Sequence, residues 1–295
     1  MLGPGGVGGL LAALLARAGN PVVVLAGDST TQAIEERGLR LESRLFGDFE
    51  VKVETAARLE SEVDAILITV KATQLERALE RVPREVAGRA LVIPFLNGID
   101  HVGFLRTRYP DQVVAATIAV EVARVAPGLI RQTSPWATVS LATSAGVEDR
   151  LERFAAQLRS TGLDVRLRED EVAMMWDKLA MLGPLALLTT HERGNVGVIR
   201  ARRRDDAIAL ISEVAAVAKA EGASPDPEAT IRLLDAAPES FETSMQRDQA
   251  AGMPLELDAI GGAVLRHAAR AGIPVPVTAR LVEELRERER VGGHT

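Results

Sequence analysis

Three glycines near the start of the chain have the spacing of a turn that binds a dinucleotide. Gly3, Gly5 and Gly8 form the pattern G-x-G-x-x-G. In such a turn the first glycine permits a tight bend, the second lets a pyrophosphate approach the backbone, and the third lets a helix pack closely on a sheet. The N–H groups and the positive dipole end of that helix then bind the phosphates. The residues expected to contact the cofactor here are Gly3, Pro4, Gly5, Gly6, Val7 and Gly8.

Nucleotide specificity depends on the residues that follow the next predicted strand. An acidic residue about 20 positions beyond the third glycine commonly binds the adenosine ribose of NAD, and Asp28 lies at that distance. The same aspartate could equally be a turn or helix-capping residue. No arginine or lysine lies between residues 28 and 32 to bind the 2′-phosphate of NADP, although Arg37 or Arg40 could fold back. These residues alone leave NAD and NADP open.

The composition argues against several classes of site and partner. The chain has 295 residues, no cysteine, four histidines and a net charge of −6. Without cysteine there are no disulfides, thiolate metal ligands or cysteine nucleophiles, and the histidines lack the spacing of a zinc site. The negative charge argues against a nucleic-acid partner, because phosphate backbones need a concentrated basic surface. We expect no metal, no nucleic acid and no membrane, and a cytoplasmic protein.

Strand and helix patterns alternate along the first half of the chain. The strand patterns are short β-branched runs bounded by turn residues, as in buried parallel sheets. They occupy residues 21–26, 64–70, 90–96, 113–125 and 137–142, and helix patterns occupy 10–18, 73–82 and 100–108. This alternation is typical of a doubly wound α/β sheet. We therefore predict a Rossmann-type dinucleotide-binding domain over residues 1–166.

The strand that should lead into the glycine turn is almost absent. Only Met1 and Leu2 precede Gly3, and two residues are too few for a strand at the centre of a sheet. A gap there would remove several buried apolar side chains, each of which stabilises a fold by about 1.5–3 kcal/mol. We expect a truncated first strand, with a start site placed too late as the favoured cause and a gap tolerated by the fold as the alternative.

The second half of the chain has helical periodicity throughout. The candidate helices span residues 169–188, 200–221, 227–236, 255–271 and 278–290, and glycines and prolines separate them. We therefore predict an all-α substrate or dimerisation domain over residues 167–295.

Four further motifs follow the glycine turn in order. The motif VKA at 70–72 ends one predicted strand and LNG at 96–98 ends the next; MWDKL at 175–179 opens the helical half, and SMQRD at 244–248 precedes Glu256. Together with the N-terminal glycines these motifs resemble the ketopantoate reductase (2-dehydropantoate 2-reductase) family over nearly the whole chain.

The resemblance implies an enzyme of pantothenate biosynthesis that reduces a 2-keto acid with NADPH. It also implies a monomer or a homodimer. Carried over by position, Lys178 is the general acid and Glu256 orients and charge-balances it. Asn97 and Lys71 contact nicotinamide, ribose or substrate, and Ser244 binds the substrate carboxylate. The chemistry is consistent, because hydride delivery to a ketone creates negative charge on oxygen that an ammonium group stabilises and protonates.

Three positions near these residues depart from the family pattern. Leu182 and Ala186, four and eight residues after the catalytic lysine, and Phe241 stand where the family has asparagines. Apolar side chains discriminate poorly for a substrate hydroxyl. We therefore expect ketopantoate to be a poor substrate and a bulkier or more apolar 2-keto acid to be preferred. Pro184 is expected to interrupt or kink the helix that carries the lysine.

The cofactor and the activity each have an alternative. NADP(H) follows from the resemblance, but Gly27 replaces the arginine that would hold the 2′-phosphate and Asp28 follows it, so NAD(H) stays open. A dinucleotide-binding sensor or partner protein that has lost catalysis is the second hypothesis, although the presence of Lys178 with Glu256 favours an enzyme. Dehydrogenases of the 6-phosphogluconate or opine type share the architecture but match the second-half motifs less well.

Overall fold

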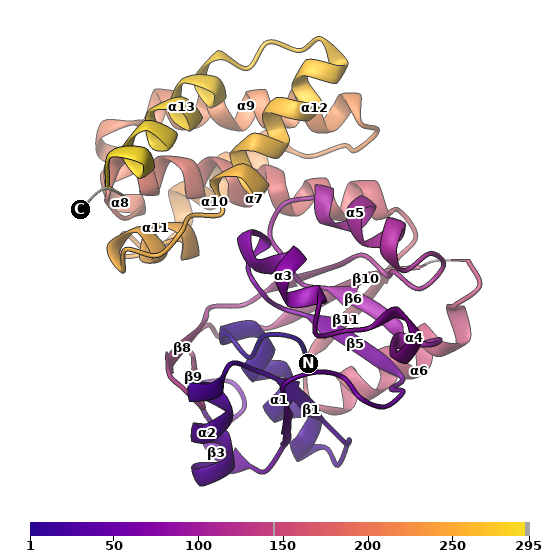
Figure 1. Ribbon diagram of the computed structural model, residues 1–295. Helices are drawn as coiled ribbons and strands as arrows, with labels where there is room; N and C mark the ends of the chain where they lie inside the picture. The colour runs from indigo at the N-terminus through magenta and orange to yellow at the C-terminus, as the bar shows by residue number, and fades with distance from the viewer. Residues whose placement is uncertain (144, 293–295) are drawn as a thin grey trace. The chain divides into compact units, whose positions relative to one another are not determined.

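The computed structural model describes residues 1–143 and 145–292, which form two compact units (Figure 1). The first unit contains Met1–Leu96 and His101–Glu171, and the second contains Asn97–Asp100 and the chain from Val172 onward. The chain thus enters the helical unit a few residues after the predicted boundary at 166–167. The short excursion of Asn97–Asp100 into the second unit has no counterpart in the sequence patterns.

A parallel sheet forms the centre of the first unit. Its strands are β1 (Val23–Leu25), β4 (Glu54–Ala56), β5 (Ala65–Ile68) and β6 (Leu91–Pro94). β1 pairs with β4 and β5 pairs with β6, both in parallel, and a bridge between Val92 and Val113 continues the sheet beyond β6. All of β6 is buried, as in parallel strands covered on both faces. The predicted α/β class is confirmed.

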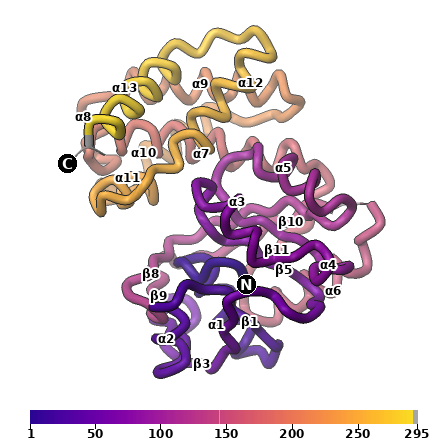
Figure 2. The backbone as a smooth tube through the Cα atoms, in the orientation of Figure 1, coloured from indigo at the N-terminus to yellow at the C-terminus, as the bar shows by residue number. Residues whose placement is uncertain are grey.

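Leu2 occupies the place of the short first strand. It forms parallel bridges to both Leu25 in β1 and Ile68 in β5. Its N–H and C=O groups bond to β5 and its continuation, with N···O distances of 2.8 and 3.0 Å. Its side chain is 1% exposed. Figure 2 shows this end of the chain within the first unit. The first strand is truncated, as expected, to one bridging residue, and the alternative of a gap at the centre of the sheet is wrong because Leu2 joins the two halves.

Helices of the first unit pack around this sheet. They are α1 (Gly6–Arg17), α2 (Asp28–Arg37), α3 (Leu75–Leu79), α4 (Arg84–Ala87), α6 (Glu148–Ser160) and most of α5 (Asp100–Arg108), with the 3-10 turn η1 (Ala72–Gln74) before α3. α1 is buried from Gly8 to Leu15. Such an apolar helix must be covered on more than one face, and a second sheet provides the additional cover.

The second sheet has the strand order β3-β2-β9-β8, and α1 contacts all four strands. These strands are β3 (Phe49–Val51), β2 (Leu39–Ser43), β9 (Leu129–Gln132) and β8 (Val122–Ala126). A Cβ on Gly9 of α1 would lie 2.4 Å from Ile130 Cδ1, so glycine permits this close approach. A third sheet contains β11 (Asp164–Arg168), β10 (Thr138–Ala142) and β7 (Ala116–Ala119). The sequence patterns indicated β7, β8 and β10 but missed β2, β3, β4, β9 and β11.

The second unit is entirely helical in its described residues, as predicted. Its elements are α7 (Glu171–Glu192), α8 (Val196–Arg202), α9 (Arg204–Ala220), α10 (Pro227–Ala236), α11 (Ser244–Ala250), the π-helical turn η2 (Asp258–Gly262), α12 (Ala263–Ala271) and α13 (Pro276–Gly292). Side-chain caps begin α8, α10 and α11. The predicted helix at 200–221 is divided between α8 and α9, and α11 was not predicted.

α7 is the central helix of this unit. It continues through Pro184 to Glu192, so the predicted interruption of the helix at this proline is wrong. Trp176, Leu179 and Leu187 belong to the apolar core that α7 shares with the other helices. By length and composition α7 could cross a membrane, but 61% of its most apolar window is buried inside the protein. That burial is typical of the core helix of a helical domain.

Candidate active site

The predicted pyrophosphate turn has the backbone geometry that its glycines require. Gly3 has φ +88°, a conformation that favours glycine, and a Cβ there would lie 2.4 Å from Val70 Cγ1. A Cβ on Gly8 would lie 2.2 Å from Thr69 Oγ1, so only glycine lets α1 approach the sheet this closely. For Gly5 the nearest described atom to a Cβ would be Thr69 O at 4.0 Å, which leaves this side of the backbone open.

The start of α1 completes an anion-binding arrangement. Gly5 is the N-cap of α1 and has no side chain to satisfy the first N–H groups of the helix. Gly6 and Val7 are the first helical residues and are half-buried, whereas Pro4 is buried. The N-terminal N–H groups and the helix dipole favour a bound phosphate at this point. The turn therefore fits a dinucleotide.

Asp28 lies at the end of the turn that follows β1. It is the first residue of α2, Gly27 is the N-cap, and the Asp28 side chain is exposed. Asp28 is thus not the N-cap and no side chain caps this helix, so the capping interpretation is wrong. A carboxylate in the first turn of a helix is favoured by the helix dipole, and the ribose-binding role of Asp28 stays a prediction. Arg37 and Arg40 pair with glutamates on their own elements, at 3.7 and 3.3 Å, and do not fold back to this turn.

Two other arginines lie at the β1–α2 turn. Arg81 Nη1 donates a hydrogen bond to Ala26 O at 2.7 Å, and Arg124 Nη1 donates to Thr30 Oγ1 at 3.4 Å. Both come from elements far along the chain, so the spacing around Asp28 gave no signal for them. These arginines give the turn a positive charge that was not expected from the sequence, in which Gly27 stands in place of an arginine.

Lys178 lies in the second unit, on α7. Its side chain is half-buried. Burial lowers the pKa of its ammonium group to about 8, and the negative charge of Glu256 opposes this fall. Desolvation disfavours a charged amine, whereas a nearby carboxylate favours it. The outcome is an amine that titrates close to neutral pH, unlike a solvated surface lysine.

Glu256 and Asn97 meet at the same part of the second unit. Glu256 is 6% exposed, and its Oε2 accepts a hydrogen bond from Asn97 Nδ2 at 2.9 Å. Asn97 comes shortly after β6, whereas Glu256 comes just before the N-cap of the π-helical turn, a feature often found at functional sites. The structure therefore brings Asn97, Glu256 and Lys178 together by a hydrogen bond and a charge interaction. Lys71 follows β5 in the first unit, at the N-cap of η1.

Ser244 is the first residue of α11. The preceding Thr243 caps this helix by accepting from Gln246 N at 3.3 Å, and its hydroxyl lies 2.9 Å from the Thr189 hydroxyl on α7. α11 is thereby attached to the helix that carries the lysine. Ser244 is half-buried, and its contact with a substrate carboxylate stays a prediction.

Two of the three apolar replacements follow the lysine along α7. Leu182 is half-buried, one helical turn after Lys178, and Ala186 is 1% exposed within the core of the unit. Phe241 packs against the same core. In the described part of the chain, no group of three or more histidine, aspartate or glutamate side chains is arranged to hold a metal ion.

Comparison with known proteins agrees with this geometry. The family model described as ketopantoate reductase PanE/ApbA matches residues 1–146, and the model of the C-terminal domain of the same family matches residues 171–289. The chain belongs to the ketopantoate reductase family. The predicted resemblance is confirmed, and family members use a nicotinamide dinucleotide.

Individual members of the ketopantoate reductase family are similar over their full length. The 2-dehydropantoate 2-reductase of Mycobacterium tuberculosis is 31% identical, with 96% of this chain and 94% of that protein covered. The crystal structure of a PanE/ApbA family ketopantoate reductase from Ralstonia eutropha JMP134 has a TM-score of 0.90 and 27% identity over 99% of this chain and 98% of that one. D-mandelate dehydrogenase with NADH and anilino(oxo)acetate shares the fold, with a TM-score of 0.90 and 23% identity over 99% and 98% of the two chains.

Proposed function

We propose that the protein is a NAD(P)H-dependent reductase that converts a 2-keto acid to the 2-hydroxy acid, with Lys178 as the proton donor. The observation that carries this proposal is the lysine whose pKa burial lowers to about 8 beside the buried carboxylate of Glu256. General acids are most effective when their pKa lies near the working pH. The family assignment and the glycine turn support the same reaction class.

The chain supplies binding, charge and one proton. When bound, the reduced dinucleotide supplies the hydride that turns the ketone into an alkoxide. The Lys178 ammonium stabilises the negative charge on the substrate oxygen and gives up one proton to it, so the product is the neutral alcohol and the lysine becomes a neutral amine that water reprotonates. Glu256 keeps that lysine largely protonated near neutral pH, since its charge raises the pKa of the amine.

Asn97 holds the carboxylate that supports the lysine. Its amide nitrogen donates to Glu256 Oε2, which satisfies one acceptor of a buried charged group that would be costly to leave without partners. The amide oxygen of Asn97 remains to contact the nicotinamide ribose or the substrate, in keeping with the family resemblance. Lys71, which follows β5, and Ser244, which begins α11, are proposed to bind the cofactor and the substrate carboxylate respectively.

The three apolar replacements favour an apolar substrate. Leu182, Ala186 and Phe241 offer no hydrogen bond to a substrate hydroxyl. We expect 2-keto acids with aliphatic or aromatic side chains to have a higher kcat/KM than ketopantoate. The test is cofactor oxidation over a panel of 2-keto acids that includes ketopantoate, in the wild-type protein and in Leu182→Asn. High turnover of ketopantoate with an ordinary KM contradicts the apolar preference. Cofactor binding without turnover of any 2-keto acid would favour the sensor hypothesis instead.

The β1–α2 turn favours NADP(H) over NAD(H). Arg81 and Arg124 bond to the backbone and hydroxyl groups at the two ends of this turn, and arginine at this position of a dinucleotide-binding fold accommodates a 2′-phosphate. Arg124→Gln and Arg81→Gln should each lower the ratio of kcat/KM for NADPH to that for NADH by about tenfold, the loss of one charge-assisted contact. Arg37→Gln is the matched control. An unchanged ratio in both variants contradicts the assignment.

A further inference from the structure

The segment Asn97–Asp100 leaves the first unit between β6 and α5 and packs on the second. Asn97 bonds to Glu256. Gly98 has φ +83°, and a Cβ there would lie 2.2 Å from Ala259 O, so the backbones touch at this point. These two contacts place the start of the segment against the stretch from Glu256 to Ala259.

Asp100 is the last contact of the segment and the most strongly bonded. Its Oδ2 accepts from Arg266 Nε at 2.9 Å and from Nη2 at 2.7 Å. Its Oδ1 lies 3.1 Å from His267 Nε2. Partial burial alone would raise the pKa of Asp100, but the hydrogen bonds from Arg266 and His267 bring it below its usual value. The carboxylate is therefore charged at neutral pH and receives donors from two consecutive residues of α12.

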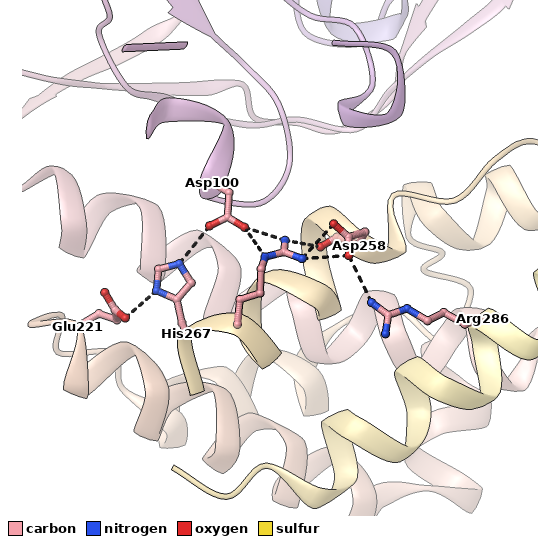
Figure 3. Close-up of polar contacts among 6 residues, drawn as sticks. Asp100, Glu221, Asp258, His267 and Arg286 are labelled. Carbon is pink, nitrogen blue, oxygen red and sulfur yellow. Dashed lines mark hydrogen bonds and ion pairs between the residues drawn. The ribbon is translucent and has the colours of Figure 1, made fainter. Parts of the chain in front are cut away.

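The partners of Asp100 are themselves fixed (Figure 3). Arg266 Nη1 donates to both carboxylate oxygens of Asp258 at 3.0 Å, and its Nη2 donates to the Asp258 backbone oxygen, also at 3.0 Å. Arg286 approaches the same Asp258 carboxylate from α13, at 3.3 Å. A planar guanidinium bonded along two edges has little freedom to rotate. The guanidinium of Arg266 is thus held in the orientation in which it binds Asp100.

His267 links Asp100 to the helix that carries the lysine. Its Nδ1 lies 2.6 Å from Glu221 Oε1, so each ring nitrogen faces a carboxylate, and the imidazolium form donates to both. Its ring packs edge-on against Trp176, with centroids 5.2 Å apart and an interplanar angle of 85°. Trp176 is buried on α7, two residues before Lys178. The residues that bind Asp100 therefore adjoin the turn of α7 that carries Lys178.

We propose that Asp100 is a positioning residue that acts through Asn97. Bound to Arg266 and His267, it anchors the Asn97–Asp100 segment, and this anchor sets the Asn97 amide against Glu256, the partner of the proton donor. The inference rests on the proposed function, because Glu256 and Lys178 are residues of that reaction. The Asp100–Arg266 pair is 42% and 43% exposed, and exposed ion pairs contribute little to the stability of a fold. Loss of this ion pair is thus expected to change the position of Asn97 more than the stability of the fold.

The test compares Asp100→Asn with Arg286→Gln in the full-length protein. Asparagine keeps the size of the side chain but removes the charge to which Arg266 and His267 bind. Arg286→Gln removes a charge from the same cluster without touching Asp100. We expect Asp100→Asn to lower kcat by 10- to 100-fold, as for a misplacement of about 1 Å, with a melting temperature within about 4 °C of wild type. In an Asn97→Ala background it should cause no further loss. An equal loss in both backgrounds, or an equal loss in Arg286→Gln, overturns the proposal.

Amide hydrogen exchange separates this proposal from the proposed function. Asp100→Asn should raise exchange in a peptide that covers Asn97–Asp100 and leave α9 unchanged, whereas Arg286→Gln should change neither. If the wild-type protein reduces no 2-keto acid, the proposed reaction fails while the exchange experiment still decides whether Asp100 anchors the segment. Unchanged exchange in Asp100→Asn overturns the anchor even if the protein is an active reductase.

Discussion

The pH dependence of the reaction gives the sharpest test of the proposed proton donor. Reduction requires the protonated form of Lys178, and its pKa is about 8. We expect kcat for keto-acid reduction to be constant below that pH and to fall tenfold for each further pH unit above it. The reverse reaction, oxidation of the 2-hydroxy acid, requires the neutral amine and should rise over the same range.

Glu256→Gln tests the origin of that pKa. The variant removes the charge that raises the pKa of Lys178 and keeps an oxygen that can accept from Asn97. A carboxylate close to a lysine changes its pKa by roughly 1–3 units, or about 1.4 kcal/mol for each unit. The falling limb of the reduction profile should therefore move from about pH 8 to roughly pH 7 or lower.

The assay is the oxidation of saturating reduced cofactor at several pH values, from about pH 6 to about pH 10, with the best substrate of the 2-keto acid panel. Asp177→Asn is the matched control, since it removes one negative charge next to Lys178 in the sequence, whereas burial and Glu256 are what shift the pKa of that lysine. A wild-type limb near the ordinary lysine pKa of about 10.4, or a limb that Asp177→Asn moves and Glu256→Gln does not, refutes the reasoning.

Three substitutions test the fold around the site. Gly8→Ala places a Cβ 2.2 Å from Thr69 Oγ1 and should destabilise the protein by about 1–3 kcal/mol and weaken NADPH binding, as measured by thermal denaturation and fluorescence titration. Gly98→Ala combines φ +83° with a Cβ 2.2 Å from Ala259 O. We expect a larger effect on kcat than on the melting temperature, and a variant with the wild-type kcat would contradict the close packing of Gly98 on Ala259. Leu2→Ala removes a side chain that is 1% exposed and should cost about 2–5 kcal/mol in urea unfolding; a loss below about 1 kcal/mol would show that the site collapses around the change.

Elements with strong local signals could be predicted from the sequence. The helix patterns at 100–108 and 227–236 match α5 and α10 to the residue, the second because Asp226 and Pro227 give a cap and a first-turn proline. The aliphatic runs that became β5 and β6 were equally clear. In each case local pattern and tertiary environment agree.

Several of the missed elements lack such agreement. α2 has the sequence DSTTQAIEER and buries only Thr30, Ala33 and Ile34, so its apolar face is too narrow to be recognised as a helix pattern. β3 and β4 have three residues each, and β2 alternates charged and apolar residues on a strand whose buried face packs on α1. The predicted helix at 255–271 begins instead as a π-helical turn, because backbone register is set by packing that a periodic pattern does not encode.

The candidate site likewise combines residues that the sequence predicted with contacts that it did not. Motifs predicted roles for Lys178, Glu256 and Asn97, but the hydrogen bond between Asn97 and Glu256 joins residues 159 positions apart. Arg81 and Arg124 reach the β1–α2 turn from other elements. One sequence contains residue types and spacings, whereas these contacts depend on how distant elements pack.

The single bridging residue at the centre of the sheet has a consequence for how the first unit folds. Leu2 has strand partners at Leu25 and Ile68, so its place exists only after both flanking strands have formed and come together. Contacts of such long sequence separation form slowly, because loop closure must precede any gain from pairing. Leu2 should therefore join the sheet late, with native contacts weak in the folding transition state. Leu2→Ala should accelerate unfolding far more than it slows refolding, which stopped-flow measurements can resolve.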